Sequence, residues 1–107
     1  MNPFLELGIR HEIVNAITEL GFEKPSPIQE KAIPVLLTGN DDFVGLAQTG
    51  TGKTAAFGLP LLEQLDFSSK QPQALVLCPT RELCLQIARD LEKFAKYIDN
   101  VHVVAVY

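Results

Sequence analysis

Residues 47–54 read Ala-Gln-Thr-Gly-Thr-Gly-Lys-Thr and constrain the fold of this chain more than any other stretch. Gly50 and Gly52 let the backbone turn tightly and approach an anion, because neither carries a Cβ. The loop runs into a predicted helix, whose free N–H groups and dipole favour negative charge. In such a loop the Lys53 side chain reaches terminal phosphates, and the Thr54 hydroxyl ligates Mg²⁺. A phosphate-binding loop is predicted; a glycine-rich turn with a helix cap is the alternative.

The neighbouring residues provide the strand–loop–helix setting that this motif requires. Residues 42–46 form a short, largely apolar run typical of a buried strand, and residues 54–65 have helical apolar density. Pro60 lacks a backbone donor, so we expect it to kink this helix, with Gly58 easing the bend.

The rest of the chain alternates between helical and strand patterns. Helices are predicted over residues 8–20, 26–38 and 80–98, and two further strands over residues 74–78 and 101–106. This alternation predicts an α/β fold with three α/β/α layers around a short parallel sheet. Because three strands leave a small sheet with an unprotected edge, the sequence indicates a domain that is truncated.

Composition excludes some function classes. The net charge is −4, and neither half is basic: residues 1–53 carry four Lys/Arg against seven Asp/Glu, and residues 54–107 five against six. Any nucleic-acid contact must therefore come from local geometry. No apolar run approaches the ~20 residues of a membrane span, so no membrane partner is expected. Cys78 and Cys84 lack C-x-x-C spacing, which favours reduced thiols in a cytoplasmic protein over a disulfide or metal pair.

Three motifs in order resemble those of DEAD-box RNA helicases. Residues 21–29, Gly-Phe-Glu-Lys-Pro-Ser-Pro-Ile-Gln, resemble the family's Q motif, and Phe4 lies seventeen residues upstream, where the family places an isolated aromatic. Residues 47–54 are similar to its motif I, and residues 79–83, Pro-Thr-Arg-Glu-Leu, to its motif Ia. The resemblance covers essentially the whole chain. It implies the N-terminal portion of a first RecA-like domain, with a Q-motif helical region at 1–39 and a P-loop α/β region at 40–107.

The resemblance also implies the cofactors ATP and Mg²⁺. A Gln side chain can pair with the N6 amino group and N7 of adenine together, which is the role it gives Gln29. Phe4 and Phe22 form an aromatic wall near the base or simply pack in the core. The implied cofactor-binding residues are Phe4, Phe22, Lys24, Gln29, Gln48, Thr49, Gly50, Thr51, Gly52, Lys53 and Thr54, with Lys53 and Thr54 catalytic and Thr54 on Mg²⁺.

An RNA contact is implied for Pro79, Thr80 and Arg81. They lie where a predicted strand ends and a helix begins, and open α/β folds bind ligands at that edge. An N-cap and a guanidinium suit a phosphate, and such backbone contacts do not read base sequence. The alternative is a plain N-cap with a surface salt bridge from Arg81 or Glu82.

The family's Asp-Glu-Ala-Asp motif, whose carboxylates hold Mg²⁺ and position the attacking water, does not occur in these 107 residues. We therefore expect an ATP-dependent RNA helicase that remodels single-stranded or short duplex RNA as the parent protein. The 107 residues are expected to bind nucleotide weakly without hydrolysis. Alternatives are another P-loop NTPase, such as a DNA helicase or translocase, and a non-catalytic fragment that self-associates through its open sheet edge.

Overall fold

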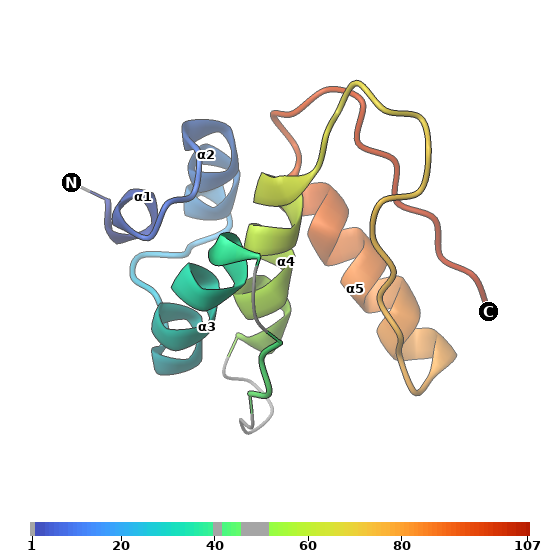
Figure 1. Cartoon of the computed structure of the whole chain (residues 1–107), viewed down its shortest axis with the longest axis horizontal. Coiled ribbons are helices and arrows are strands. Elements are labelled where there is room, and N and C mark those ends of the chain that lie inside the picture. The colour runs from blue at the N-terminus through green and yellow to red at the C-terminus, as the bar shows by residue number, and fades with distance from the viewer. Residues whose placement is uncertain (1, 40–41, 46–51) are drawn as a thin grey trace.

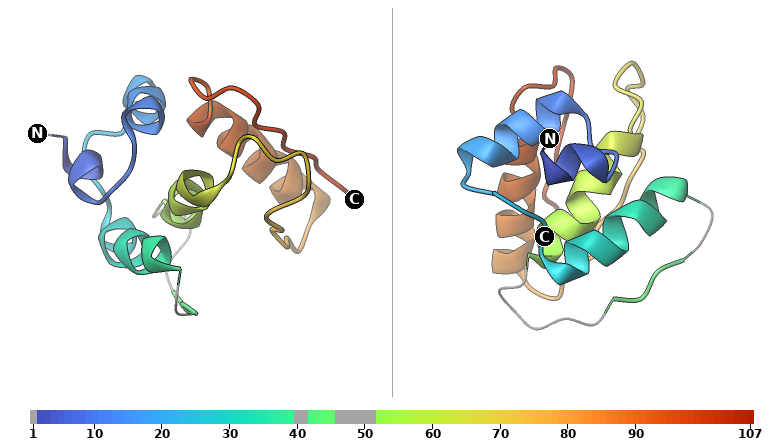
Figure 2. Two further views of the ribbon diagram at one scale, coloured as in Figure 1. Left: turned by 45° about the horizontal axis from the view of Figure 1, so that its top comes forward. Right: turned by 90° about the vertical axis from the view of Figure 1, so that its left-hand side faces the viewer.

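Helices make up the framework of this protein. The computed structural model describes residues 2–39, 42–45 and 52–107. Within them α1 to α3 lie on one side of α4, and α5 with two extended segments on the other (Figures 1 and 2). None of these helices has the length and apolar character needed to cross a bilayer. The helices are α1 (Pro3–Glu6), α2 (His11–Glu19), α3 (Pro27–Thr38), α4 (Lys53–Gln64) and α5 (Arg81–Phe94).

Cap residues set the helix boundaries, and most were predictable. Ser26 caps α3, and Gly39 ends it with φ of 70°. The predicted helix at 8–20 is shorter, because Gly8 has φ of +105°, which a right-handed helix cannot contain. The preceding residues instead form α1, which the sequence pattern did not reveal. Similarly, α5 ends at Phe94 and not at residue 98.

Two glutamines tie α3 to α4, which run in the same direction. At one end Gln29 Nε2 donates to the carbonyl of Gly52 at 3.2 Å. At the other end Gln64 Nε2 donates to the carbonyl of Leu36 at 2.6 Å. Between them lies an apolar core that includes the fully buried Ile33 and Leu59. Both ends of the pair are therefore held, and the start of α4 has a fixed place beside α3.

Gly58 lets α4 and α5 approach closely. A Cβ at this position would lie 2.9 Å from Leu91 Cδ2 and 3.6 Å from Phe94 Cε2. The helix α4 continues through Pro60, which is buried. The structure thus shows a second reason for a glycine here, the close approach of α5, beside the predicted easing of a bend at Pro60.

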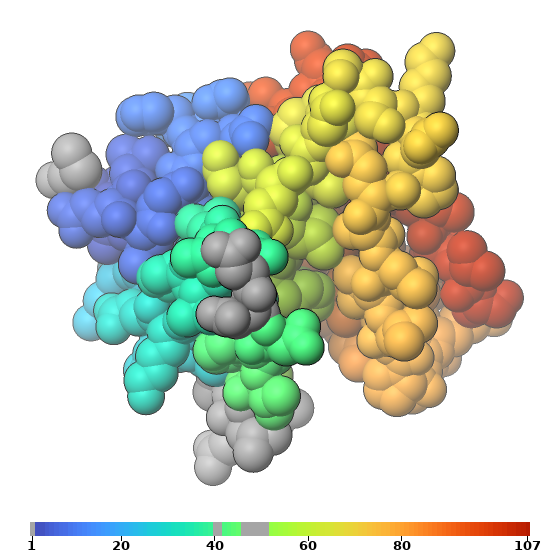
Figure 3. All heavy atoms as spheres, viewed as in Figure 1, coloured from blue at the N-terminus to red at the C-terminus, as the bar shows by residue number. Residues whose placement is uncertain are grey.

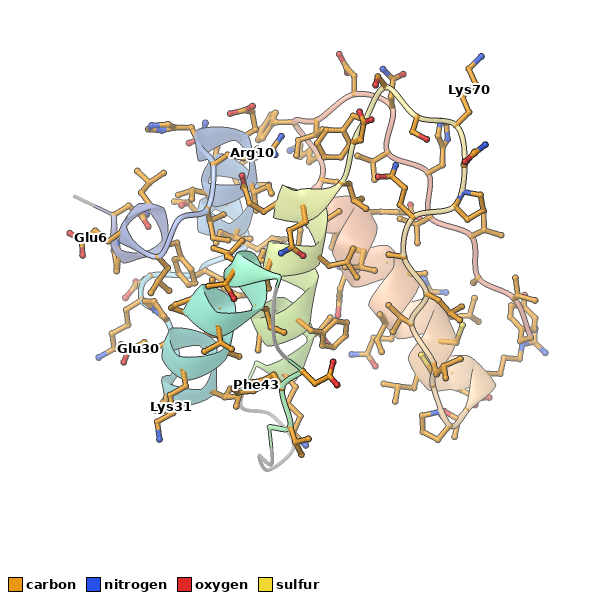
Figure 4. All side chains as sticks on the ribbon, viewed as in Figure 1. Glu6, Arg10, Glu30, Lys31, Phe43 and Lys70 are labelled. Atoms are coloured by element: carbon orange, nitrogen blue, oxygen red, sulfur yellow. The ribbon has the colours of Figure 1, made fainter. Side chains whose placement is uncertain are left out.

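Arg10 joins α2 to the end of α4. Its backbone N–H and its Nε both donate to Glu63 Oε1, at 2.9 and 3.1 Å, and its terminal NH2 donates to the carbonyl of Glu63 at 3.0 Å. Figure 4 shows Arg10 at the start of α2, beside the upper end of α4. A cation there also complements the partial negative charge at the C-terminus of a helix.

The predicted parallel sheet is not confirmed. Among the described residues no backbone hydrogen bonds join segments 74–78 and 101–107, which are extended but unpaired. Their side chains alternate as in strands: Val76 and Val103 pack against the core, while Leu75 and Val104 are exposed. Both segments thus have strand character, but neither has a neighbouring strand to bond its N–H and C=O groups. The first predicted strand falls partly outside the described residues.

An apolar groove of about 790 Å³ separates these two extended segments. Its floor comes from α4 and α5, including Leu62, Ile87 and Leu91. In Figure 3 the first segment is the yellow and orange band toward the viewer, and the second appears in red beyond it. The groove and its exposed rim were not predicted.

Glu19 connects the end of α2 to the turn after α5. Lys96 Nζ donates to Glu19 Oε1 at 2.9 Å, and the Tyr97 hydroxyl donates to Oε2. The hydrogen bonds from Tyr97 and then Lys96 hold the pKa of the Glu19 carboxyl below its ordinary value of 4.5. The pKa of Glu19 is thus lower in the folded state than in the unfolded state.

We expect Glu19→Gln to flatten the acid limb of the stability profile. With a depressed folded pKa, the contribution of Glu19 is fully present above pH 4.5 and is lost as the pH falls through the folded value. Denaturation midpoints measured between pH 3 and 7 check this. Glu23→Gln serves as the control, because no hydrogen bond from a described residue reaches that carboxylate. Equal flattening in both variants would contradict the assignment.

Candidate nucleotide and RNA site

Three helix N-termini lie at one end of the molecule. In Figure 1 the first residues of α3, α4 and α5 all lie at the lower end, and the Glu30 and Lys31 labels in Figure 4 mark the α3 end. Gln29 belongs to the first of these ends, Lys53 to the second and Arg81 to the third. The structure therefore places one residue of each motif, Gln29, Lys53 and Arg81, at the same end of the molecule (Figure 1).

Gln29 connects the first two of these ends through its side-chain amide. Its Oε1 accepts from the Ser26 N–H at 2.9 Å, and its own N–H donates to Ser26 Oγ at 3.4 Å, forming a capping box. Its Nε2 donates to the Gly52 carbonyl at 3.2 Å. One amide thus starts α3 and also holds the residue that precedes α4.

Gln29 is the only buried polar residue in the described part of the chain, with 3% of its surface exposed. A Gln amide can donate twice from Nε2 and accept twice at Oε1. Contacts with described residues use one donor and one lone pair, so within residues 2–39, 42–45 and 52–107 one of each is unused. Adenine needs one of each, and pairing with it stays a prediction, because only 3% of Gln29 is exposed.

Gly52 fits this position for two reasons. Its φ is +83°, a left-handed conformation that favours glycine, and an added Cβ would lie 2.4 Å from Gln29 Nε2. Having no side chain, Gly52 also leaves the first N–H groups of α4 uncapped, whereas Ser26 and Thr80 cap α3 and α5. Free N–H groups at this helix end fit a phosphate.

Lys53 and Thr54 open α4 beside these N–H groups. The Lys53 side chain is exposed, and Thr54 is half-buried. This donor set suits a nucleotide: an ammonium for terminal phosphates and a hydroxyl for Mg²⁺. Four of the predicted cofactor residues, Gln48, Thr49, Gly50 and Thr51, lie outside the described residues.

The aromatic candidates lie in the core. Phe4 is fully buried, so its ring presents no surface to a base, as in the core-packing alternative. Its centroid lies 6.1 Å from that of Phe22, which is half-buried and lies 6.0 Å from that of Phe94, edge-on. Of the remaining Q-motif candidates, Lys24 is exposed in the loop before α3.

The motif around Arg81 is exposed at the start of α5. Thr80 Oγ1 accepts from the Leu83 N–H at 3.2 Å, so the predicted N-cap is confirmed. Pro79 and Arg81 are both exposed. The alternative salt bridge is not formed with any carboxylate in the described ranges. Instead the Arg81 guanidinium lies 4.5 Å from the centre of the Tyr107 ring, a contact that sequence reasoning missed.

Cys78 and Cys84 line the groove near Arg81 as free, half-buried thiols, in agreement with the prediction. Burial, and then the neighbouring Cys84, raises the pKa of the Cys78 thiol. This keeps Cys78 in the protonated, less nucleophilic form at neutral pH.

Known proteins are similar to this chain in sequence and fold. The DEAD/DEAH box helicase family model matches residues 26–107. The ATP-dependent RNA helicase DeaD of Haemophilus influenzae is 55% identical over 104 residues, 97% of this chain and 17% of that protein. Among solved structures, S. cerevisiae Dbp5 bound to RNA and ADP BeF3 matches with a TM-score of 0.85 and 39% identity, covering 91% of this chain and 25% of that one. A DEAD box protein from Methanococcus jannaschii matches with a TM-score of 0.82 and 43% identity. That match covers 86% of this chain and 25% of the other.

The chain belongs to the DEAD/DEAH box helicase family, because the family model covers more than half of its length. It spans about a sixth of the curated relatives that it matches. The structural matches support the predicted RecA-like fold class, although no sheet is paired in the residues that the structure describes.

We expect Gly52→Ala to lower the free energy of unfolding by about 2–5 kcal/mol. The left-handed backbone costs a residue with a Cβ about 1–2 kcal/mol. Displacing the Gln29 amide leaves buried polar groups unpaired, at a further cost of about 1–3 kcal/mol. Chemical denaturation of both proteins measures the difference.

Gly21→Ala is the matched control. Gly21 has φ of +96°, but an added Cβ would meet nothing within 4 Å. This variant should therefore lose only the backbone contribution of about 1–2 kcal/mol. Equal losses at positions 21 and 52 would show that the contact with Gln29 contributes nothing.

Proposed function

We propose that this chain is the nucleotide-binding part of a cytoplasmic, ATP-dependent RNA helicase that uses ATP hydrolysis to remodel RNA. The hydrogen bond from Gln29 to the Gly52 carbonyl is the observation that carries the proposal. It brings the residue proposed to read adenine against the start of the phosphate-binding helix. Base and phosphates of one nucleotide can thus be held together.

The proposed roles follow from the chemistry of each group. Gln29 pairs with adenine, which favours ATP over GTP, while Lys53 and the free N–H groups of α4 bind the phosphates. Thr54 holds Mg²⁺, and Lys24 and Phe22 remain proposed contacts to the base. Bound Mg²⁺ would neutralise phosphate charge. Residues Gln48 to Thr51 complete the loop.

Pro79, Thr80 and Arg81 are the proposed RNA contacts. All three are exposed at the same end of the molecule as Lys53. The structural likeness to Dbp5 bound to RNA supports this assignment. Contacts to the sugar–phosphate backbone would bind single-stranded or short duplex RNA without reading its sequence.

In the full-length protein, Lys53→Ala should lower RNA-stimulated ATP hydrolysis by about 100-fold or more, as loss of a group that stabilises transition-state charge does. Lys70→Ala, in the exposed loop at the opposite end of the molecule (Figure 4), should leave it unchanged. A steady-state ATPase assay measures both. The 107 residues alone, which lack Asp-Glu-Ala-Asp, should bind nucleotide weakly and turn over well below ~1 s⁻¹.

Two results would overturn these assignments. Stimulation of the full-length protein by DNA and not by RNA would support the rival class of P-loop DNA helicases and translocases. A Lys53-dependent rate of ~1 s⁻¹ or more in the 107 residues would show that hydrolysis needs no further carboxylates.

Self-association is a second proposal for the 107-residue chain. It is favoured by the exposed apolar side chains of the extended segments, with Leu75, Leu77, Val104 and Val106 each about 80% exposed. Light scattering should give a mass that rises with concentration, and Leu77→Ser with Val104→Ser should reduce it. A monomer at high concentration in the unmodified chain would exclude this proposal.

A further inference from the structure

Arg81 stacks on an aromatic ring from a distant part of the chain. It is the first residue of α5, and Tyr107 ends the extended segment that begins near residue 101. The guanidinium carbon lies 4.5 Å from the centre of the Tyr107 ring, well within cation–π range. Both residues line the groove between the extended segments.

The register of residues 101–107 directs Tyr107 toward α5. Val101 and Val103 pack against the core, so odd-numbered positions face the helices, while Val104 and Val106 face outward. Tyr107 falls on the inward side, yet 69% of it remains exposed because it lies beyond the core. The packed valines therefore hold the ring beside Arg81.

Stacking leaves the hydrogen-bonding capacity of Arg81 free. The five N–H groups of a guanidinium point outward in its plane, whereas a stacked aromatic ring contacts its flat face. Within residues 2–39, 42–45 and 52–107, no salt bridge or side-chain hydrogen bond uses these groups. An Arg side chain restricted by an aromatic ring loses less conformational freedom when it binds a phosphate in a bidentate manner.

We propose that Tyr107 is a positioning residue that holds the Arg81 guanidinium for a phosphate of the RNA backbone. This inference rests on the proposed RNA contact at Arg81. Tyr107 does not itself need to touch RNA. Its effect should therefore depend on the presence of Arg81.

The test is a double-mutant cycle on the full-length protein, with the affinity for a fluorescent single-stranded oligonucleotide as the readout. Arg81→Ala should weaken binding about 10-fold or more, as loss of a charge-assisted contact does. Tyr107→Leu should weaken it about 2- to 5-fold, and Tyr107→Phe, which keeps the ring, should bind normally. In the Arg81→Ala background, Tyr107→Leu should cause no further loss.

Two further readouts separate positioning from a general structural role. Tyr107→Leu should raise the RNA concentration needed for half-maximal ATPase stimulation, with kcat and the KM for ATP unchanged. Because Tyr107 is mostly exposed, the thermal unfolding midpoint of the Tyr107→Leu variant should also stay unchanged. A shifted midpoint, or an equal loss in Tyr107→Phe, would overturn the inference.

The failures of the two proposals can be told apart. If Arg81→Ala binds RNA normally, the proposed contact at Arg81 is wrong, and the inference falls with it. If Arg81→Ala weakens binding but Tyr107→Leu does not, the inference alone is wrong. Additive losses in the double variant would show that Tyr107 contacts RNA independently of Arg81, for example by stacking on a base, and would also overturn it.

Discussion

The side-chain amide of Gln29 is the interaction on which the arrangement of this protein depends. It closes the capping box with Ser26 and also bonds to the carbonyl of Gly52. The first contact fixes where α3 begins, and the second fixes where α4 begins relative to it. Because the amide is buried, each unpaired partner would carry a desolvation cost. The same side-chain amide therefore caps α3 and positions the start of α4.

Local signals explain why much of the fold was predictable. Ser26, Gly39 and Thr80 mark helix boundaries by chemistry that acts within a few residues. The same holds for α4, which begins directly after Gly52. The Q-motif resemblance predicts an adenine contact for Gln29, whereas its bond to Gly52 joins residues 23 positions apart and is encoded by no local pattern.

The unpredicted features depend on residues far apart in the chain. Arg10 and Glu63 meet across 53 residues, and Arg81 meets Tyr107 across the α5 helix and the turn that follows it. Strand pairing is likewise non-local. The sequence predicts residues 101–106 as a strand of a sheet covered on both faces, whereas the structure buries one face, exposes the other and, among the described residues, provides no neighbouring strand.

The missing side chain at Gly58 has a geometric consequence beyond packing density. Since α4 begins at the phosphate loop and α5 begins at Arg81, the separation of these two helices sets the distance between the proposed nucleotide and RNA contacts. Gly58 sets that separation by allowing Leu91 to approach the α4 backbone. One position in the middle of a helix thus sets the distance between two proposed ligand contacts, although it lies at neither of them.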